Sequence, residues 1–239
     1  MNYSVMFSSA GVGETYLANI GFKCAAANEL ITKRAQFHNH LYPDANMVIG
    51  DIKNNEIFNE FVKSSIDSKI DLLLATPPCQ GFSLSGKNKN LEQMKNDDRN
   101  FLVFKVFDAI DKIKPNYVLI ENVPRFLNMY FPYKGDLYNI VDLLKLLYGS
   151  EYTVESKVLN SMNYGVPQSR KRSFIKIYKK SKAWDWPTET PEKLTVRDAI
   201  GHLPSLESEE KSDIKWHFGR KHSSQHILWR NILLSISCG

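Results

Sequence analysis

The segment Thr-Pro-Pro-Cys-Gln-Gly-Phe-Ser at residues 76–83 holds the side chain with the strongest chemistry in the chain, Cys79. A thiolate is the best common nucleophile among protein side chains, and the two prolines stiffen the backbone that presents it. A lone cysteine is more often a buried structural residue. Here the cysteine lies between an apolar run at residues 70–75 and a long polar stretch at residues 83–100, which favours a positioned and reachable nucleophile.

A second chemical group is Glu121, which with Asn122 follows the apolar run at residues 117–120. A carboxyl group that leaves a buried strand is costly unless it is paired or used, and burial raises its pKa. Such a group can share a proton with a ring nitrogen. A structural ion pair is the alternative that remains open.

Three further positions suit the binding of a nucleotide-like ligand. Small residues around Gly11 follow the first apolar run and allow close approach of a ligand, although a tight strand–helix turn explains them equally well. Glu29 and Asp51 follow the next two runs. Carboxylates there can accept hydrogen bonds from ribose hydroxyls and from an adenine amino group, whereas each alone is more often a surface or capping acid.

A late basic segment, Gln-Ser-Arg-Lys-Arg at residues 168–172, precedes another apolar run. In an extended segment Gln168, Arg170 and Arg172 share one face. Two arginines on one face suit recognition of phosphate or carbonyl groups, although the bare pattern is not specific.

The elements that must position these residues alternate between strands and helices. Strands are predicted at residues 3–7, 22–27, 46–49, 70–75 and 117–120, and helices at residues 13–19, 30–40, 57–64, 101–113 and 137–147. Runs at residues 152–159 and 173–178 predict an antiparallel pair. The pattern indicates an α/β fold with a doubly wound, mainly parallel sheet and an antiparallel edge hairpin. Because the segments that hold Gly11, Glu29, Asp51, Cys79 and Glu121 each follow a strand end, these residues are expected at one edge of the sheet.

Composition sets further bounds on the 239-residue chain. We expect a catalytic domain at residues 1–180 and an extension at residues 181–239, with a short helix at residues 194–200 capped by Thr195 and Asp198. No apolar run approaches the roughly 18 residues of a membrane span, and three cysteines without metal-ligand spacing indicate a reducing, cytoplasmic setting with no metal.

Charge is unevenly distributed along the chain. Residues 1–156 hold 16 Lys/Arg and 18 Asp/Glu, whereas residues 157–239 hold 15 and 8. The basic end fits a polyanionic partner, or simply a solvated surface.

The order of these motifs resembles that of the DNA (cytosine-5)-methyltransferases, over roughly residues 5–178 and faintly to residue 203. The matches at Pro-Pro-Cys-Gln-Gly-Phe-Ser and Glu-Asn-Val are highly specific. Residues 168–172 match the family's Gln-x-Arg-x-Arg, and residues 195–200 resemble the segment that follows it. The resemblance implies a Rossmann-like fold, S-adenosylmethionine as methyl donor, double-stranded DNA as substrate, and base flipping in bacterial restriction–modification.

The resemblance also implies a role for each matching position. The residues expected to bind S-adenosylmethionine are Phe7, Gly11, Glu29, Asp51 and Pro78. Cys79 would attack carbon 6 of cytosine, Glu121 would hold the ring nitrogen and amino group, and Arg172 would support that pocket. The residues expected to contact DNA or support the catalytic loop are Ser85, Lys87, Gln168 and Arg170.

The sequence also departs from the family pattern. Ser9 and Val12 stand where the family's motif usually has glycine, and a target-recognition domain with the motifs after it is absent before Gly239. A truncated chain, a disrupted gene and one subunit of a split enzyme remain open, with weak or absent methylation expected from this chain alone. Two other functions also remain open: tRNA cytosine methylation and a catalytically silent fragment that binds DNA or S-adenosylmethionine. A nucleotide-dependent dehydrogenase is a further reading, which gives Cys79 and Glu121 no role.

Overall fold

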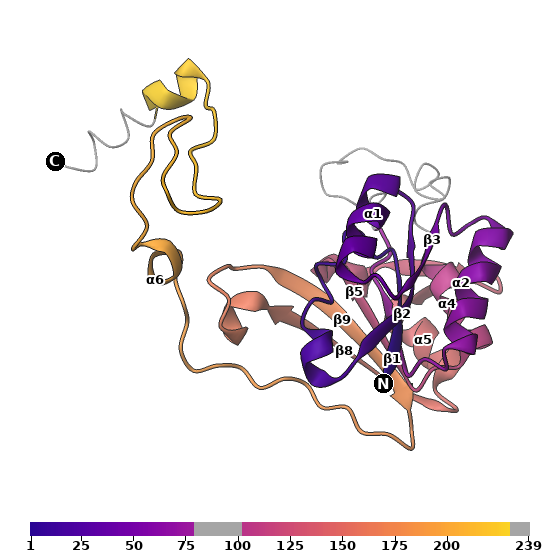
Figure 1. The fold of residues 1–239 in the computed structure, drawn as a ribbon. Helices are drawn as coiled ribbons and strands as arrows, with labels where there is room; N and C mark the ends of the chain where they lie inside the picture. The colour runs from indigo at the N-terminus through magenta and orange to yellow at the C-terminus, as the bar shows by residue number, and fades with distance from the viewer. Residues whose placement is uncertain (79–101, 230–239) are drawn as a thin grey trace. The chain divides into compact units, whose positions relative to one another are not determined.

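A computed structural model describes residues 1–78 and 102–229 of the chain (Figure 1). The described residues form two compact units, one comprising residues 1–78, 102–160 and 170–189 and the other residues 161–169 and 190–229. No helix among the described residues is long and apolar enough to span a bilayer.

The first unit is built on a seven-stranded sheet in the order β3-β2-β1-β4-β5-β9-β8. Its parallel part consists of β1 (Asn2–Met6), β2 (Lys23–Glu29), β3 (Asn46–Ile49), β4 (Leu72–Ala75) and β5 (Tyr117–Asn122). Two antiparallel strands extend it, β9 (Lys171–Lys179) beside β5 and β8 (Tyr152–Asn160) at the edge. The predicted fold class, a mainly parallel sheet with an antiparallel edge pair, is confirmed.

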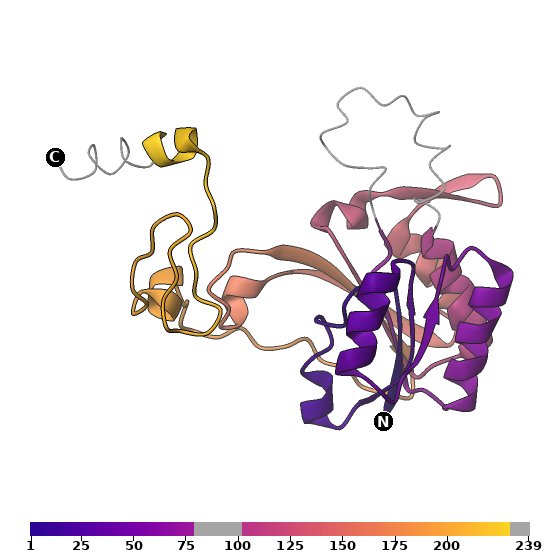
Figure 2. The same ribbon diagram turned by 45° about the horizontal axis from the view of Figure 1, so that its top comes forward.

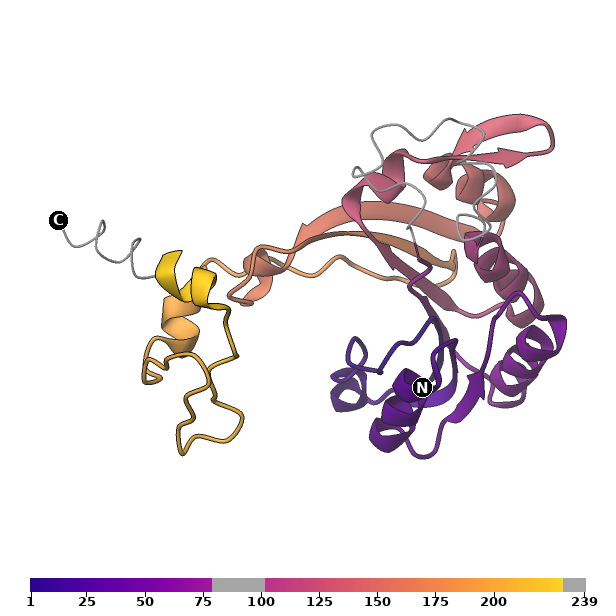
Figure 3. The same cartoon turned by 90° about the horizontal axis from the view of Figure 1, so that it is seen from above.

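Helices cover both faces of this sheet, as the view in Figure 3 shows. One face carries α2 (Asn55–Asp67), α4 (Leu102–Ile113) and α5 (Ile140–Tyr148) over the larger hydrophobic core. In α2, Phe58, Phe61, Val62 and Ser65 are buried at the spacing of a single helix face. The other face carries α1 (Thr32–Leu41) and a smaller core that includes Tyr3, Val5 and Leu72.

Two local predictions were wrong. The helix expected at residues 13–19 is only a 3₁₀ turn, η1 (Leu17–Ile20). The large apolar side chains of this stretch, Val12, Tyr16 and Ile20, are 67%, 79% and 65% exposed, so no packed face stabilises a longer helix. The helix expected at residues 137–147 begins only at Ile140, because residues 137–139 belong to β7 (Asp136–Asn139). β7 pairs with β6 (Tyr130–Tyr133) in an antiparallel hairpin that follows the 3₁₀ turn η4 (Pro124–Asn128) and was not predicted (Figure 2).

The second unit contains the 3₁₀ turn η5 (Ser161–Tyr164) and α6 (Val196–Ile200). The predicted cap is confirmed, because the Thr195 hydroxyl accepts from the Asp198 backbone and the Asp198 carboxylate accepts from the Thr195 backbone. None of the described residues of this unit is buried.

Candidate active site at the carboxyl ends of the strands

The turn after β1 has an unusual backbone. Phe7, Ser9 and Gly11 have φ angles of 61°, 52° and 75°, in the left-handed region that disfavours residues with a Cβ atom. A conformation of this kind persists only where the surroundings hold it. The Ser8 backbone N–H donates to the Asn28 carbonyl at 2.9 Å, and the Thr76 hydroxyl donates to the Phe7 carbonyl at 3.0 Å.

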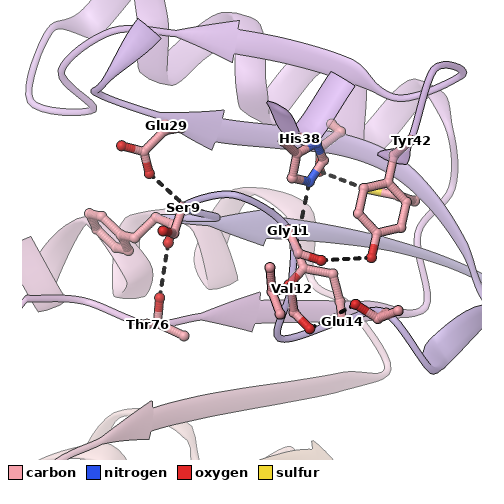
Figure 4. A network of polar contacts seen from close by, with 12 residues as sticks. Ser9, Gly11, Val12, Glu14, Glu29, His38, Tyr42 and Thr76 are labelled. Atoms are coloured by element: carbon pink, nitrogen blue, oxygen red, sulfur yellow. Dashed lines mark hydrogen bonds and ion pairs between the residues drawn. The ribbon is translucent and has the colours of Figure 1, made fainter. Parts of the chain in front are cut away.

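Glu29 ties this turn to the end of β2 (Figure 4). One carboxylate oxygen accepts the Ser9 N–H and the other accepts the Ile31 N–H, each at 2.8 Å. Each carboxylate oxygen retains a lone pair after these bonds, because a carboxylate can accept about four hydrogen bonds. The buried Glu29 therefore holds the turn and can still accept from a ligand.

The end of β3 joins the same cluster through Asn28 and Gly50. The Asn28 side-chain amide donates to the Val48 and Gly50 carbonyls at 2.9 and 3.1 Å, and the Gly50 N–H donates to the Glu29 carbonyl at 3.0 Å. Asp51 follows directly, exposed, with one oxygen accepting the Lys53 N–H at 2.9 Å. We call the set Phe7, Ser9, Gly11, Glu29 and Asp51 the β1–β3 edge.

Pairing of β4 with β5 brings the Pro-Pro-Cys segment to the Glu-Asn-Val segment. Ala75 lies opposite Ile120 in the parallel register, so the residues after each strand leave the sheet side by side. The Asn122 amide donates to the Pro77 carbonyl at 2.9 Å in a buried bond, which fixes the backbone two residues before Cys79. Pro77 is buried and Pro78 is partly exposed, whereas Cys79, Ser85 and Lys87 lie outside the described residues.

Glu121 pairs with Arg172 across β5 and β9. Arg172 Nε lies 3.0 Å from Glu121 Oε1, and the side chains are 25% and 29% exposed. The two residues share a face because Glu121 lies opposite Phe174, two positions along β9. Burial raises the pKa of Glu121 above its usual value, although the charges of Arg172 and Arg170 oppose the shift. We call Pro77, Glu121, Asn122 and Arg172 the β5–β9 edge.

The remaining basic residues do not follow the prediction that Gln168, Arg170 and Arg172 share one face of a strand. β9 begins only at Lys171, so Arg172 alone of the three lies in it. Gln168 belongs to the second unit, where its N–H donates to the Val166 carbonyl at 2.7 Å in a bend. Arg170 belongs to the first unit and is exposed.

The two edges form one continuous cluster, joined where the hydroxyl of Thr76 reaches Phe7 and the amide of Asn122 reaches Pro77. Sequence patterns did not reveal Thr76 or Asn122 as connecting residues, although each lies within a motif that was recognised. Val12, which stands where the family's motif usually has glycine, is 67% exposed.

The β1–β3 edge suits a ligand with several hydrogen-bond donors. It offers acceptors at Glu29 and Asp51, and the buried Ser8 hydroxyl has no hydrogen-bond partner among the described residues. Ribose hydroxyls and an adenine amino group have the matching donors. Among the described residues no group of three or more His, Cys, Asp or Glu is placed to hold a metal ion.

An α/β sheet with this edge defines a nucleotide- or cofactor-binding protein of the doubly wound class. The model of the C-5 cytosine-specific DNA methylase family matches residues 1–237. The chain belongs to that family.

Curated relatives support the same assignment. The chain is 44% identical to the type II methyltransferase M1.HgaI of Avibacterium volantium over 94% of its own length, and 30% identical to M1.HphI of Haemophilus parahaemolyticus over 95%. It spans 62% and 59% of the length of these two relatives.

Solved structures show the same fold. A prophage-encoded E. coli protein described as a DNA modification methyltransferase superposes with a TM-score of 0.66 at 28% identity, covering 89% of this chain and 58% of that one. The Spodoptera frugiperda DNMT2 variant structure superposes with a TM-score of 0.57 at 20% identity, covering 80% and 56%, which supports the fold alone.

Proposed function

We propose that this chain catalyses transfer of a methyl group from S-adenosylmethionine to carbon 5 of cytosine in duplex DNA, in bacterial restriction–modification. The observation that carries the proposal is that the β1–β3 edge and the β5–β9 edge are continuous. Methyl transfer requires the bound methyl donor, at the first edge, to lie next to the acid–base group Glu121, at the second. The family and the type II methyltransferase relatives support DNA as the substrate.

S-Adenosylmethionine would be bound by the β1–β3 edge and would supply the electrophilic methyl group. In this proposal Glu29 accepts from the ribose and Asp51 from the adenine amino group, while Phe7 and Gly11 shape the turn and Pro78 shapes the pocket. The support is that Glu29 and Asp51 flank the turn and keep free acceptor positions.

The chemistry at cytosine is proposed to begin with Cys79. Its thiolate forms a bond to carbon 6, and protonation at the ring nitrogen, with Glu121 as donor, compensates the charge. Addition at carbon 6 opens the double bond between carbons 5 and 6, so carbon 5 becomes nucleophilic. Carbon 5 takes the methyl group as the bond from that methyl to sulfur breaks, which releases S-adenosylhomocysteine. A base then removes the proton from carbon 5, the bond to Cys79 breaks, the double bond returns, and the ring nitrogen gives its proton back to Glu121.

The environment of Glu121 suits this role. Burial raises its pKa, which increases the fraction of protonated carboxyl near neutral pH, and Arg172 fixes its orientation at 3.0 Å. Stacking inside a duplex covers both faces of the cytosine ring, so Cys79 cannot reach carbon 6 there. The cytosine must therefore be flipped out of the duplex, at a cost of about a few kcal/mol. We propose that Ser85, Lys87, Gln168 and Arg170 contact the DNA or support the loop that closes on it.

The proposal includes a second subunit that supplies target recognition. The support comes from the unit formed by residues 161–169 and 190–229 of this chain, in whose described residues no side chain is buried. A recognition surface on such a unit needs further protein to pack against.

The direct test is methyl transfer from radiolabelled S-adenosylmethionine to duplex DNA and, in parallel, to tRNA. The chain is assayed alone and with a candidate partner chain, and Cys79→Ser serves as the inactive control. We expect label in 5-methylcytosine of DNA. Labelling of tRNA alone would contradict the choice of substrate, and labelling by Cys79→Ser would contradict the mechanism.

A further inference from the structure

Two side chains of the α1 segment hold the turn after β1, and no sequence motif pointed to them. The hydroxyl of Tyr42, at the end of α1, donates to the Gly11 carbonyl at 2.8 Å. His38 is fully buried, and its Nε2 lies 3.5 Å from Oε1 of Glu14, which is 6% exposed. Figure 4 shows both side chains directed at the turn from the side opposite Thr76.

The turn packs closely against these two rings. A Cβ atom on Gly11 would lie 2.6 Å from Cε2 of Tyr42 and 2.8 Å from Cδ2 of His38, which is too close for any other residue. The two rings also contact each other, with centroids 4.7 Å apart. The close approach that requires glycine at this position is therefore an approach to α1.

Glu14 is buried close to other titratable side chains. Burial raises the pKa of the nearby Cys24 thiol to about 12, and the charge of Glu14 adds to this rise. A buried carboxyl group is costly without a polar neighbour, and His38 provides one at 3.5 Å, which restrains the chain that leaves the turn. Tyr42 and His38 thus hold the middle and the far end of the turn, respectively.

The near end of the turn is linked to the start of the same helix. Glu29 accepts the Ser9 N–H through one oxygen and the Ile31 N–H, just before α1, through the other. The turn is consequently fastened to both ends of α1. Phe7 and Ser9 have φ angles in the left-handed region, which is unfavourable for residues with a Cβ atom. Without the hydrogen bonds and contacts to α1, we therefore expect the turn to adopt other conformations.

We propose that His38 and Tyr42 are positioning residues for S-adenosylmethionine, which keep the turn in its binding conformation without touching the ligand. This inference rests on the proposed function. When a binding-competent conformation is only partly populated, the apparent dissociation constant rises in inverse proportion to its population. Cutting a tie should therefore weaken binding of S-adenosylmethionine, beyond any loss of stability.

The test compares two tyrosine variants in the full chain by calorimetric titration with S-adenosylmethionine. Tyr42→Phe removes only the hydroxyl that reaches Gly11. Tyr152→Phe is the matched control, because its hydroxyl donates to the Pro115 carbonyl at 3.1 Å on the other face of the sheet. We expect about fivefold to tenfold weaker binding for Tyr42→Phe and no change for Tyr152→Phe, while both lower the melting temperature.

A second pair of variants tests the buried contact between His38 and Glu14. His38→Gln and Glu14→Gln should each weaken binding by about tenfold, and the double variant should lose less than the product of the two. Unchanged affinity in Tyr42→Phe overturns the inference whether or not the His38 variants fold, because it leaves a purely structural role. If the wild-type chain itself does not bind S-adenosylmethionine, the proposed function fails first, which is a distinct result.

Discussion

The two edges of the site are held by different kinds of interaction. At the β1–β3 edge most ties involve the backbone, such as the N–H groups of Ser9 and Ile31 on the buried Glu29. At the β5–β9 edge the central tie is a half-buried ion pair between Glu121 and Arg172. The first arrangement fixes the shape of a turn, whereas the second orients a carboxyl group whose pKa burial raises and Arg172 partly lowers. Substitutions at the first should alter binding, and substitutions at the second should alter chemistry.

The largest expected effect is that of Glu121→Gln. The glutamine amide has the shape of the Glu121 carboxyl group but cannot transfer a proton to the ring nitrogen of cytosine. Attack of Cys79 on DNA containing 5-fluorocytosine should therefore slow by a factor of about 100 or more. Affinity for S-adenosylmethionine should stay within about twofold of wild type, because no hydrogen-bond acceptor of the β1–β3 edge is lost.

The control for this substitution is Glu155→Gln. Glu155 also pairs with a cation of β9, Lys176, at 3.0 Å, but away from the β4 and β5 ends. Its replacement should leave the rate of adduct formation unchanged. If Glu121→Gln weakens binding of S-adenosylmethionine as strongly as it slows the adduct, the proposed separation between the edges is lost.

Glu29→Gln makes the complementary test at the β1–β3 edge. One of the two backbone N–H groups would face the amide nitrogen and lose its acceptor. We expect about tenfold or greater weakening of S-adenosylmethionine binding, and a decrease of about 1–3 kcal/mol in the free energy of unfolding.

Titration calorimetry and urea unfolding measure these two quantities, with the exposed Glu60→Gln as the neutral control. The rate of adduct formation at saturating S-adenosylmethionine should be nearly that of wild type. A rate as low as that of Glu121→Gln would mean that Glu29 belongs to the chemistry.

Asn122→Ala should sharpen the comparison, because its amide joins the ends of β4 and β5. Loss of the bond to the Pro77 carbonyl frees the backbone that presents Cys79. Adduct formation should slow by a factor of about ten, with a smaller change in S-adenosylmethionine affinity. Asn116→Ala is the matched variant at the amino end of β5, where the amide donates to Asp71 at 3.0 Å. Equal effects of the two would contradict a local role for Asn122.

The smallest expected effect is a pKa change caused by Arg172→Gln. Burial already raises the pKa of Glu121, and Arg172 opposes that rise, so removal of the guanidinium should raise the pKa further. Carbon-13 NMR titration of the glutamate carboxyls measures it. A fall in the pKa would contradict the assignment of Arg172 as the opposing charge.

The same shift has a consequence for stability. A carboxyl whose pKa is higher in the folded chain contributes stability that is fully present below the unfolded pKa and is lost as the pH rises through the folded pKa. Because Arg172→Gln widens this gap, the variant should lose more stability than wild type over that pH window. Urea unfolding at a series of pH values checks the difference.

Much of the fold could be predicted because the strands read as short apolar runs. The buried run of β4 and the spacing in α2 and α4 follow the usual periods. The hairpin of β6 and β7 was missed, and the helix predicted at residues 137–147 covered most of β7. Pro132 within β6 also weakens the sequence signal for a strand. In the structure Lys134 and Gly135 have positive φ angles of 51° and 91°, as in a two-residue hairpin turn.

The site was less predictable from sequence than the fold. Motifs identified Glu29, Asp51 and Glu121. Glu29 and Glu121 lie in the last two residues of β2 and β5, and Asp51 lies just after β3, so the topology of the sheet brings them to one edge. The contacts that bind these residues together join positions far apart in the sequence, such as Thr76 with Phe7 or Tyr42 with Gly11. No local period encodes such contacts, so they required the three-dimensional structure.

The central claim is that the segment held by Asn122 presents Cys79 to a cytosine beside the bound methyl donor. The most direct measurement is mass spectrometry of the chain after incubation with S-adenosylmethionine and duplex DNA containing 5-fluorocytosine. We predict a peptide in which Cys79 is linked to a methylated fluorocytosine, formed only with S-adenosylmethionine and absent in Cys79→Ser. A linkage at another residue, or a methylated adduct that persists in Cys79→Ser, would contradict the account.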